Sequence, residues 1–187
     1  MMKIGLMGYG KAGKAVANVL ANDPRYQLCW VMRRSSSEQA HLEGQPQIPV
    51  VGLAGLDIGD WLDQHPVDAI VDFSQADSVY LYGQELRRRG IMLVSAISAY
   101  TPQHLDYLRE MGQDTRVMGS PNITLCFNFL LLAAKLLRGI APFADVEVVE
   151  QHFREKPEIS GTARKIAETL ELGGDRVTSL RVGGIVG

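Results

Sequence analysis

Short runs of consecutive apolar residues recur along the first part of the chain, and a helical pattern follows each of them. The runs are too short for helices and are apolar throughout, so we expect buried strands. They occupy residues 3–7, 27–32, 67–73 and 91–94. The first helix is predicted over 10–21, with a packed face formed by Ala12, Ala15, Val16, Val19 and Leu20. Strands that alternate with helices predict a parallel, doubly wound sheet.

The pattern changes twice along the chain. Residues 35–55 are polar and rich in Gly and Pro, so we expect mostly loop there, with one short strand at 48–51. A short strand at 116–118 is followed by Ser120-Pro121-Asn122, which interrupts the alternation. Further elements are then predicted: a helix at 124–138, a strand at 146–150, a helix at 161–172 and a strand at 176–182.

These elements predict an α/β protein with two domains. Residues 1–120 are expected to form a Rossmann-type, doubly wound parallel sheet that binds a dinucleotide. Residues 121–187 are expected to form a smaller α+β domain for substrate binding and oligomerisation.

Composition and charge narrow the function classes. Hydrophobic residues make up 46% of the chain and charged residues 21%, which is typical of a packed globular protein. The net charge is −2 and there is no basic stripe, so nucleic acid is not an expected partner. The basic run Arg87-Arg88-Arg89 precedes Gly90 and is predicted to be the solvated last turn of a helix.

The cysteines and the apolar segments indicate the compartment. Cys29 and Cys126 each lie in an apolar run, so we expect buried, reduced thiols, with neither a disulfide nor a metal site. The chain starts directly in a strand without a cleavable signal, and its longest apolar stretch, 127–137, is too short to span a bilayer. The expectation is a cytoplasmic protein that has no membrane partner.

A glycine motif lies between the first strand and the first helix. Gly8-Tyr9-Gly10-Lys11-Ala12-Gly13 fits the G-x-G-x-x-G pattern, in which the glycines allow a tight turn and close approach of a pyrophosphate to a helix amino terminus. The alternative is a glycine-rich turn that serves packing alone. The surrounding strand and helix favour cofactor binding.

The end of the second strand indicates which cofactor is expected. Sites for NAD place a carboxylate about 20 residues after the motif to bind the ribose 2′-hydroxyl. This chain has Arg33-Arg34-Ser35-Ser36 there, and guanidinium groups suit a 2′-phosphate. NADPH is therefore the predicted cofactor, with NADH possible; in the alternative interpretation, one arginine only stacks on adenine or faces solvent.

A candidate catalytic segment follows the strand at 146–150. His152 can donate a proton near neutral pH and Lys156 can supply a fixed positive charge, while Ser160-Gly161-Thr162 at a helix start offers N–H groups and hydroxyls to a carboxylate. In a straight strand, His152 and Lys156 would stand ~13 Å apart, so the chain has to bend before Pro157 if both are to reach one substrate. Taken alone, these residues also fit an ordinary surface helix and its cap.

The segment Glu150-x-His152-x-x-x-Lys156 with Ser160-Gly161-Thr162-Ala163 resembles the signature of the dihydrodipicolinate reductase family, the NAD(P)H-dependent reductases of lysine and diaminopimelate synthesis. Other segments resemble family motifs in the same order, so the resemblance covers essentially the whole chain. These segments are the glycine motif, Val71-Asp72-Phe73-Ser74, Ser120-Pro121-Asn122-Ile123-Thr124-Leu125 with Asn128, and Arg181-Val182-Gly183-Gly184-Ile185-Val186-Gly187.

The resemblance implies a role for each matching residue. His152 is similar to the family's catalytic acid, Lys156 to its catalytic or carboxylate-holding lysine, and Ser160, Gly161 and Thr162 to its carboxylate-binding loop. Arg34 falls where the family binds the 2′-phosphate. Further cofactor contacts are expected from Phe73, Ser74, Ala96, Ser98 and Asn122. The family also implies a homo-oligomer, a dimer or a tetramer, built through the sheets of the second domain.

The chain departs from the family pattern in three places. Ala96-Ile97-Ser98-Ala99 replaces the family's Gly-Thr-Thr-Gly, and Phe153 replaces the second of two histidines. The loop from Lys156 to Ser160 is one residue shorter. Family members also continue beyond the position that matches Gly187, so the chain is either a short form or a fragment.

Three functions are therefore carried forward. The first is a reductase of a small carboxylated cyclic imine or enamine, specifically 4-hydroxy-tetrahydrodipicolinate reductase. The second is a reductase of the same fold that acts on another carboxylated substrate. The third is an NADPH-binding module without catalytic activity.

Overall fold

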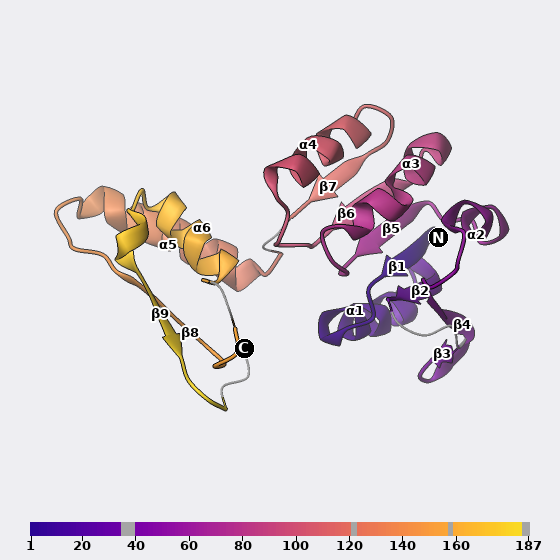
Figure 1. Cartoon of the computed structure of the whole chain (residues 1–187), viewed down its shortest axis with the longest axis horizontal. Coiled ribbons are helices and arrows are strands. Elements are labelled where there is room, and N and C mark those ends of the chain that lie inside the picture. Colours follow the sequence, from indigo (N-terminus) through magenta and orange to yellow (C-terminus); the bar gives the residue numbers. More distant parts are fainter. Residues whose placement is uncertain (35–39, 121–122, 157–158, 185–187) are drawn as a thin grey trace. The chain divides into compact units, whose positions relative to one another are not determined.

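The computed structural model describes residues 1–34, 40–120, 123–156 and 159–184. The chain divides into two compact units, Met1–Pro121 and Asn122–Gly187 (Figure 1). Each unit has its own sheet, and each is described by itself.

Unit 1 is built on a seven-stranded sheet with the order β3-β4-β2-β1-β5-β6-β7. The strands are β1 Met2–Met7, β2 Tyr26–Arg33, β3 Ala40–Leu42, β4 Gln45–Gly52, β5 Ala69–Asp72, β6 Met92–Ser95 and β7 Val117–Gly119. Pairing is parallel throughout except at the edge strand β3, which runs antiparallel to β4. The doubly wound α/β fold expected from the sequence is confirmed.

The helices of unit 1 cover both faces of this sheet. They are α1 Lys11–Asn22, α2 Ile58–Gln64, α3 Ser78–Arg89 and α4 Pro102–Met111 (Figure 1). Helix α3 ends at Gly90, which has the left-handed φ of 65°, and its last turn carries the three arginines. Arg88 is exposed as expected for a solvated turn, whereas Arg87 and Arg89 are half-buried and form ion pairs with neighbouring carboxylates. Helix α4 begins with a capping box, in which Thr101 and His104 each bind the other's backbone N–H.

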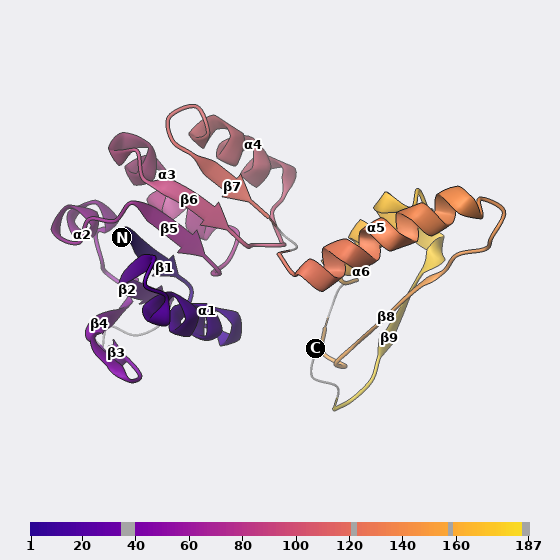
Figure 2. The same ribbon diagram turned by 180° about the vertical axis from the view of Figure 1, so that it is seen from behind.

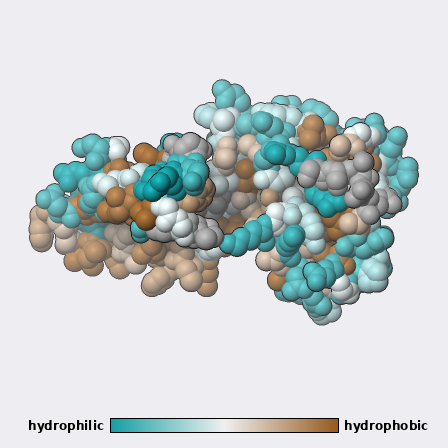
Figure 3. Space-filling model, turned by 60° about the horizontal axis from the view of Figure 1, so that its bottom comes forward, coloured by the Kyte–Doolittle hydropathy of each residue, from teal (hydrophilic) through white to brown (hydrophobic). Residues whose placement is uncertain are grey.

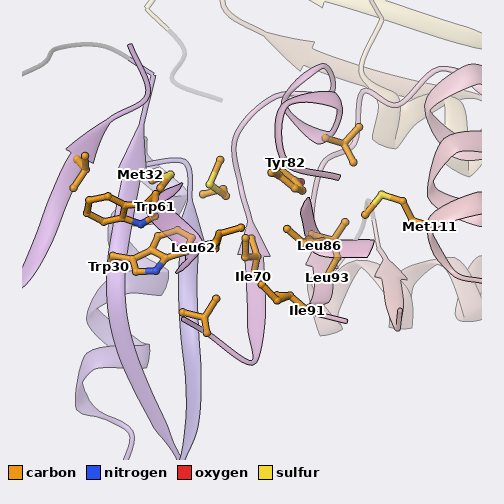
Figure 4. Close-up of a cluster of buried hydrophobic side chains, with 14 of the residues drawn as sticks. Trp30, Met32, Trp61, Leu62, Ile70, Tyr82, Leu86, Ile91, Leu93 and Met111 are labelled. Atoms are coloured by element: carbon orange, nitrogen blue, oxygen red, sulfur yellow. The ribbon is translucent and has the colours of Figure 1, made fainter. Parts of the chain in front are cut away.

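Two apolar clusters lie on opposite sides of the sheet. One joins side chains from α2, α3 and α4 to strand residues, with Trp30, Tyr82, Leu86 and Met111 completely or almost completely buried (Figure 4). The other contains Ala17 of α1 with Leu6, Val31 and Val50. Burial on both faces explains why the central strands are apolar throughout rather than alternating.

Three details differ from the sequence-based expectations. The packed positions of α1 are Gly13 and Ala17, with Val16 and Leu20 partly buried, whereas Ala12, Ala15 and Val19 are exposed. Small residues face the sheet because the helix lies close to it. The segment predicted to be mostly loop contains the β3–β4 hairpin, and β4 is longer than the predicted strand. Ser35 and Ser36 lie outside the described residues.

Unit 2 contains one long helix and a small βαβ arrangement. Its elements are α5 Leu125–Ile140, β8 Val148–His152, α6 Gly161–Thr169, a 3₁₀ turn at Gly174–Arg176 and β9 Val177–Arg181 (Figure 2). Strands β8 and β9 pair in parallel, and α6 connects them. Val148, Ala163 and Ala167 are the buried side chains that cluster in this small core.

Helix α5 leaves most of its apolar side chains in solvent. Leu125 is 84% exposed, Phe129 69% and Ile140 70%, and no residue of the helix is fully buried. Apolar side chains gather accordingly along one side of unit 2 (Figure 3). The expectation that Cys126 is buried is wrong, because this helix exposes it; Cys29 is half-buried.

Within the described part of the chain, no helix combines the length and the apolar character needed to cross a bilayer.

The two tryptophans, Trp30 and Trp61, both lie in the core of unit 1, so their fluorescence reports the unfolding of that unit. We expect Leu86→Ala to lower the free energy of unfolding by about 2–5 kcal/mol, because a completely buried side chain is removed and a cavity remains. Leu81→Ala is the matched control on the same helix. Leu81 is 59% exposed, and we expect a change of about 0.5 kcal/mol or less. Equal losses in urea titrations would contradict the assigned packing of α3.

Candidate functional site

The carboxyl ends of the parallel strands in unit 1 form one edge with a continuous hydrogen-bonded backbone. The first residue after a strand donates its N–H to a carbonyl of the last or next-to-last residue of a neighbouring strand. These bonds are Gly8 to Met32 (2.8 Å), Phe73 to Met7 (2.8 Å), Ala96 to Asp72 (2.9 Å) and Ser120 to Ser95 (2.8 Å). The loops predicted to bind the cofactor therefore start along a single line.

The glycine turn after β1 depends on two very close backbone contacts. Gly8 has a φ of 94°, and a Cβ there would lie 2.6 Å from the carbonyl group of Phe73. A Cβ at Gly13 would lie 2.0 Å from the carbonyl oxygen of Gly8. Neither backbone atom can move aside, so both positions require glycine.

The third glycine of the motif faces open space. A Cβ on Gly10 would contact nothing within 4 Å, and no side chain caps α1 at this residue. The amino end of α1 therefore has room for a ligand beside its backbone. The residues fit an anionic group such as a pyrophosphate, because the helix amino terminus carries partial positive charge.

A cleft of about 660 Å³ extends from this turn. Its lining combines the glycine turn (Gly8, Tyr9, Gly10, Lys14), the end of β2 (Met32, Arg33, Arg34), the loop after β4 (Leu53, Ala54) and the loop after β5 with the start of α3 (Phe73, Ser74, Gln75, Ser78, Leu81). Seven predicted cofactor residues thus share one cleft: Gly8, Tyr9, Gly10, Arg33, Arg34, Phe73 and Ser74. Lys11, Ala12 and Gly13 belong to the adjoining first turn of α1.

Basic side chains lie at this cleft. Arg34 is exposed, and its Nη1 donates to Oε1 of Gln75 at 2.8 Å, which connects the end of β2 with the loop after β5. The Lys14 Nζ lies 5.5 Å from the centre of the Tyr9 ring. Arg34 and Lys14 therefore add positive charge to the cleft beside the amino terminus of α1.

Asp72 supports the loop after β5, which lines the cleft. Its carboxylate is completely buried at the end of β5 and accepts from the Ser74 N–H (2.8 Å), the Ser74 hydroxyl (2.5 Å) and the Tyr82 hydroxyl. Burial raises the pKa of Asp72, although these hydrogen bonds oppose the shift. Burial and the facing carboxyl also raise the pKa of Tyr82. Asp72 thus holds the loop that carries Phe73 and Ser74.

The loop after β6 also lies at this edge. Ala96 is half-buried and Ser98 is exposed, whereas Ile97 points into the protein. The buried Ser95 hydroxyl lies 2.8 Å from the Tyr100 hydroxyl, and burial raises the pKa of Tyr100 to about 12. Ser98 therefore presents a hydroxyl to solvent from a firmly held loop. Asn122, also predicted to contact the cofactor, lies outside the described residues.

The predicted catalytic residues belong to unit 2. His152 is the last residue of β8, and its Nδ1 binds Oε2 of Glu150, two residues earlier on the same face of the strand. The side chain of Glu150 is only 7% exposed. Burial would raise the pKa of Glu150, but hydrogen bonds from Ser179, Arg181 and His152 outweigh it and lower the pKa to about 2. Glu150 is therefore a carboxylate at neutral pH.

The chain turns after His152 and before Pro157, where the sequence analysis expected a bend. The Lys156 N–H donates to the Phe153 carbonyl at 3.2 Å, which closes a turn, and Arg181 Nε donates to the Lys156 carbonyl at 2.9 Å. Lys156 is half-buried beside this turn. The backbone of Lys156 is thus attached to β9.

The predicted carboxylate loop begins α6. Ser160 occupies the N-cap position as expected, but its side chain makes no capping hydrogen bond. Its N–H instead donates to Oε1 of Glu150 at 3.4 Å. Gly161 and Thr162 are exposed, and a Cβ on Gly161 would contact nothing within 4 Å. The amino end of α6 therefore has space for an anion.

Sequence reasoning did not select Glu150, Ser179 and Arg181 as site residues. The signal for Glu150 was present, because a carboxylate two residues before a histidine on a strand lies on the same face. Ser179 and Arg181 carry no comparable signal, since their approach to Glu150 depends on the pairing of β8 with β9.

Comparison with known proteins connects these sites to one family. A family model described as dihydrodipicolinate reductase, N-terminus, matches residues 2–123, which is more than half of the chain. A 4-hydroxy-tetrahydrodipicolinate reductase of Myxococcus xanthus is 33% identical over 111 residues, 58% of this chain and 41% of that relative. One of Archaeoglobus fulgidus is 24% identical over 172 residues, 90% of this chain and 65% of that relative. The chain thus spans about two fifths to two thirds of the length of these curated relatives.

Solved structures show the same architecture. A dipicolinate-bound dihydrodipicolinate reductase from Paenisporosarcina sp. TG-14 superposes with a TM-score of 0.72 at 19% identity, covering 100% of this chain and 80% of that one. At this identity the likeness shows the fold alone. Because the family model covers most of unit 1 and its match includes the glycine turn, the chain belongs to the dihydrodipicolinate reductase family.

Proposed function

We propose that the protein is an NADPH-dependent reductase of a small carboxylated cyclic imine or enamine, specifically 4-hydroxy-tetrahydrodipicolinate reductase of lysine and diaminopimelate biosynthesis. One observation carries the proposal: Glu150 binds both His152 and the N–H of Ser160 at the start of α6. A single buried carboxylate therefore connects the proposed proton donor with the proposed carboxylate-binding loop. Membership of the family supports the reaction class.

Unit 1 is proposed to hold the cofactor. Gly8, Gly10 and the first turn of α1 would bind the pyrophosphate, and Arg34 with Arg33 would bind the 2′-phosphate, which favours NADPH over NADH. Ser98 and Ala96 would lie beside the nicotinamide. The bound nicotinamide would supply the hydride.

Unit 2 is proposed to hold the substrate. The N–H groups of Gly161 and Thr162 and the hydroxyls of Ser160 and Thr162 would bind a substrate carboxylate, and Lys156 would add positive charge. The Ser160 N–H is not counted among these donors, because it binds Glu150. His152 would deliver the proton through Nε2, because its Nδ1 is engaged by Glu150. The free thiols Cys29 and Cys126 suit the reducing cytoplasm, where we place this reaction.

A second candidate is a reductase of the same fold with another carboxylated substrate. Two observations favour it: Ser98 supplies the one hydroxyl within Ala96-Ile97-Ser98-Ala99, and Phe153 presents a partly exposed aromatic ring immediately after His152. An aromatic ring in place of an imidazole would favour a less polar substrate.

We further propose that a second copy of this chain covers the apolar side of α5. The core of unit 2 is very small, and domains of this size commonly need oligomerisation for stability. Leu125, Phe129, Leu132 and Leu136 follow one another at spacings of four, three and four residues, which suits helix-to-helix packing. The two copies would bury these side chains against each other.

Cofactor discrimination tests the role of Arg34. In Arg34→Gln, we expect the Kd for NADPH to rise about tenfold or more, because a charge-assisted hydrogen bond to the 2′-phosphate is lost, and the Kd for NADH to change less than about threefold. Calorimetry measures both. Arg25→Gln is the matched control, since Arg25 precedes the amino end of β2 and pairs with Asp23. Equal weakening of both cofactors would refute the assigned role, and absence of any binding at millimolar concentration would refute the cofactor itself.

Turnover tests the role of His152. In His152→Gln, we expect kcat for dihydrodipicolinate-dependent NADPH oxidation to fall by about 10²- to 10⁴-fold, because the proton donor is removed. The Kd for NADPH should stay constant, since His152 belongs to the other unit. His41→Gln in β3 is the control and should behave like the unsubstituted protein. Turnover of a different carboxylated imine alone would favour the second candidate, and NADPH binding without any turnover would favour a non-catalytic module.

Sedimentation velocity tests the oligomer. We expect the unsubstituted protein to sediment as a dimer or larger species and Leu132→Lys/Leu136→Lys to sediment as a monomer, because two charges would enter the apolar contact. Val19→Lys, on the exposed face of α1, is the control and should not change the mass. A monomeric unsubstituted protein at micromolar concentration would exclude the proposed contact.

A further inference from the structure

Glu150 uses its two carboxylate oxygens for different partners. Oε1 accepts from the Ser179 hydroxyl (2.7 Å), Arg181 Nη1 (2.9 Å) and the Ser160 N–H (3.4 Å). Oε2 faces Nδ1 of His152. One oxygen therefore binds the protein scaffold, and the other binds the imidazole.

We propose that Glu150 is a positioning residue that holds neutral His152 in the tautomer protonated at Nδ1 and keeps Nε2 directed to the substrate. A carboxylate offers no proton, so the imidazole nitrogen facing it must be the donor. The role in the reaction rests on the proposed function. The tautomer itself follows from the geometry around β8.

The direction of proton transfer follows from this arrangement. As the nicotinamide hydride adds to one atom of the substrate C=N or C=C bond, a protonated imidazolium would give its Nε2 proton to the other atom. The neutral ring that remains would keep its proton on Nδ1, hydrogen-bonded to the Glu150 carboxylate. One proton leaves His152 and none leaves Glu150. The carboxylate thus keeps the ring oriented before and after transfer without changing its own charge.

Arg181 connects Glu150 to the neighbouring elements of unit 2. It binds Glu150 through Nη1 and the Lys156 carbonyl through Nε, while Glu150 also binds the Ser160 N–H. The pairing of β8 with β9 aligns His152 with Arg181 and Glu150 with Ser179. The Glu150–Arg181 pair therefore connects the proton donor, the Lys156 turn and the start of α6.

The ¹⁵N chemical shifts of the histidine rings test the proposal without substrate or cofactor. The chain supplies two internal references. His65 Nδ1 lies 3.2 Å from the Trp61 carbonyl oxygen and must be protonated there, whereas His104 Nδ1 accepts from the Thr101 N–H at 3.2 Å, so its neutral ring carries the proton on Nε2. We expect neutral His152 to resemble His65.

Glu150→Gln should invert this tautomer. The amide oxygen of the glutamine would remain with the three donors, including the charged Arg181, so its NH₂ group would face His152. His152 Nδ1 would then have to accept, and the proton would move to Nε2, giving the His104 pattern. Ser179→Ala is the matched control, because it removes a partner of Oε1 and leaves the carboxylate, and it should retain the Nδ1 proton.

Kinetics separate this role from a purely structural one. We expect kcat of Glu150→Gln to fall at least about tenfold, because the imidazolium would point its Nδ1 proton at an NH₂ group, while the Kd for NADPH stays constant. An Nε2 proton on His152 in the unsubstituted protein, or an unchanged tautomer in folded Glu150→Gln, would overturn the proposal. If Glu150→Gln fails to fold, the unsubstituted protein and Ser179→Ala still decide the tautomer. A confirmed tautomer without turnover would disprove the proposed function and leave the positioning assignment intact.

Discussion

Parallel pairing of strands is the constraint on which both candidate sites depend. In unit 1, β1 pairs in parallel with β2 and with β5, so the carboxyl ends of all three lie at one edge. The glycine turn, Arg34 and the Asp72 loop follow these ends directly. The hydrogen bond from Phe73 to Met7 and the contact of Gly8 with Phe73 then fix the turns against each other. A cleft for an extended anionic cofactor is the consequence.

The same principle operates in unit 2 on a smaller scale. Because β8 and β9 run in parallel, Glu150 lies opposite Ser179, and His152 lies opposite Arg181. A buried carboxylate is costly unless its oxygens are satisfied, and here β9, His152 and the start of α6 satisfy them. Burial of Glu150 therefore requires that the strand pair, the turn and the helix start assemble together.

The residues that depart from the family pattern lie outside the hydrogen bonds that hold Glu150 and His152. Ala96-Ile97-Ser98-Ala99 keeps the backbone position after β6, since Ala96 donates to Asp72, but offers one hydroxyl at Ser98. Phe153 follows His152 outside the Glu150 cluster. The residues that hold the His152 ring are thus separate from the residues at which the chain departs from the family pattern.

The sequence by itself determined the parallel sheet, the glycine turn and the helix start at Ser160, because periodicity, glycine spacing and caps are local properties of the chain. It also nominated His152 and Arg34 as candidate site residues, because each stands at the end of a predicted strand beside other polar residues. The packed face of α1 was predicted wrongly, since close approach to the sheet selects Gly13 and Ala17 over larger apolar residues. The partnership of Glu150 with Ser179 and Arg181 was decided only by tertiary structure. These residues are about 30 positions apart in the chain, and no local rule specifies that β9 pairs with β8 in the register that brings a guanidinium to that carboxylate.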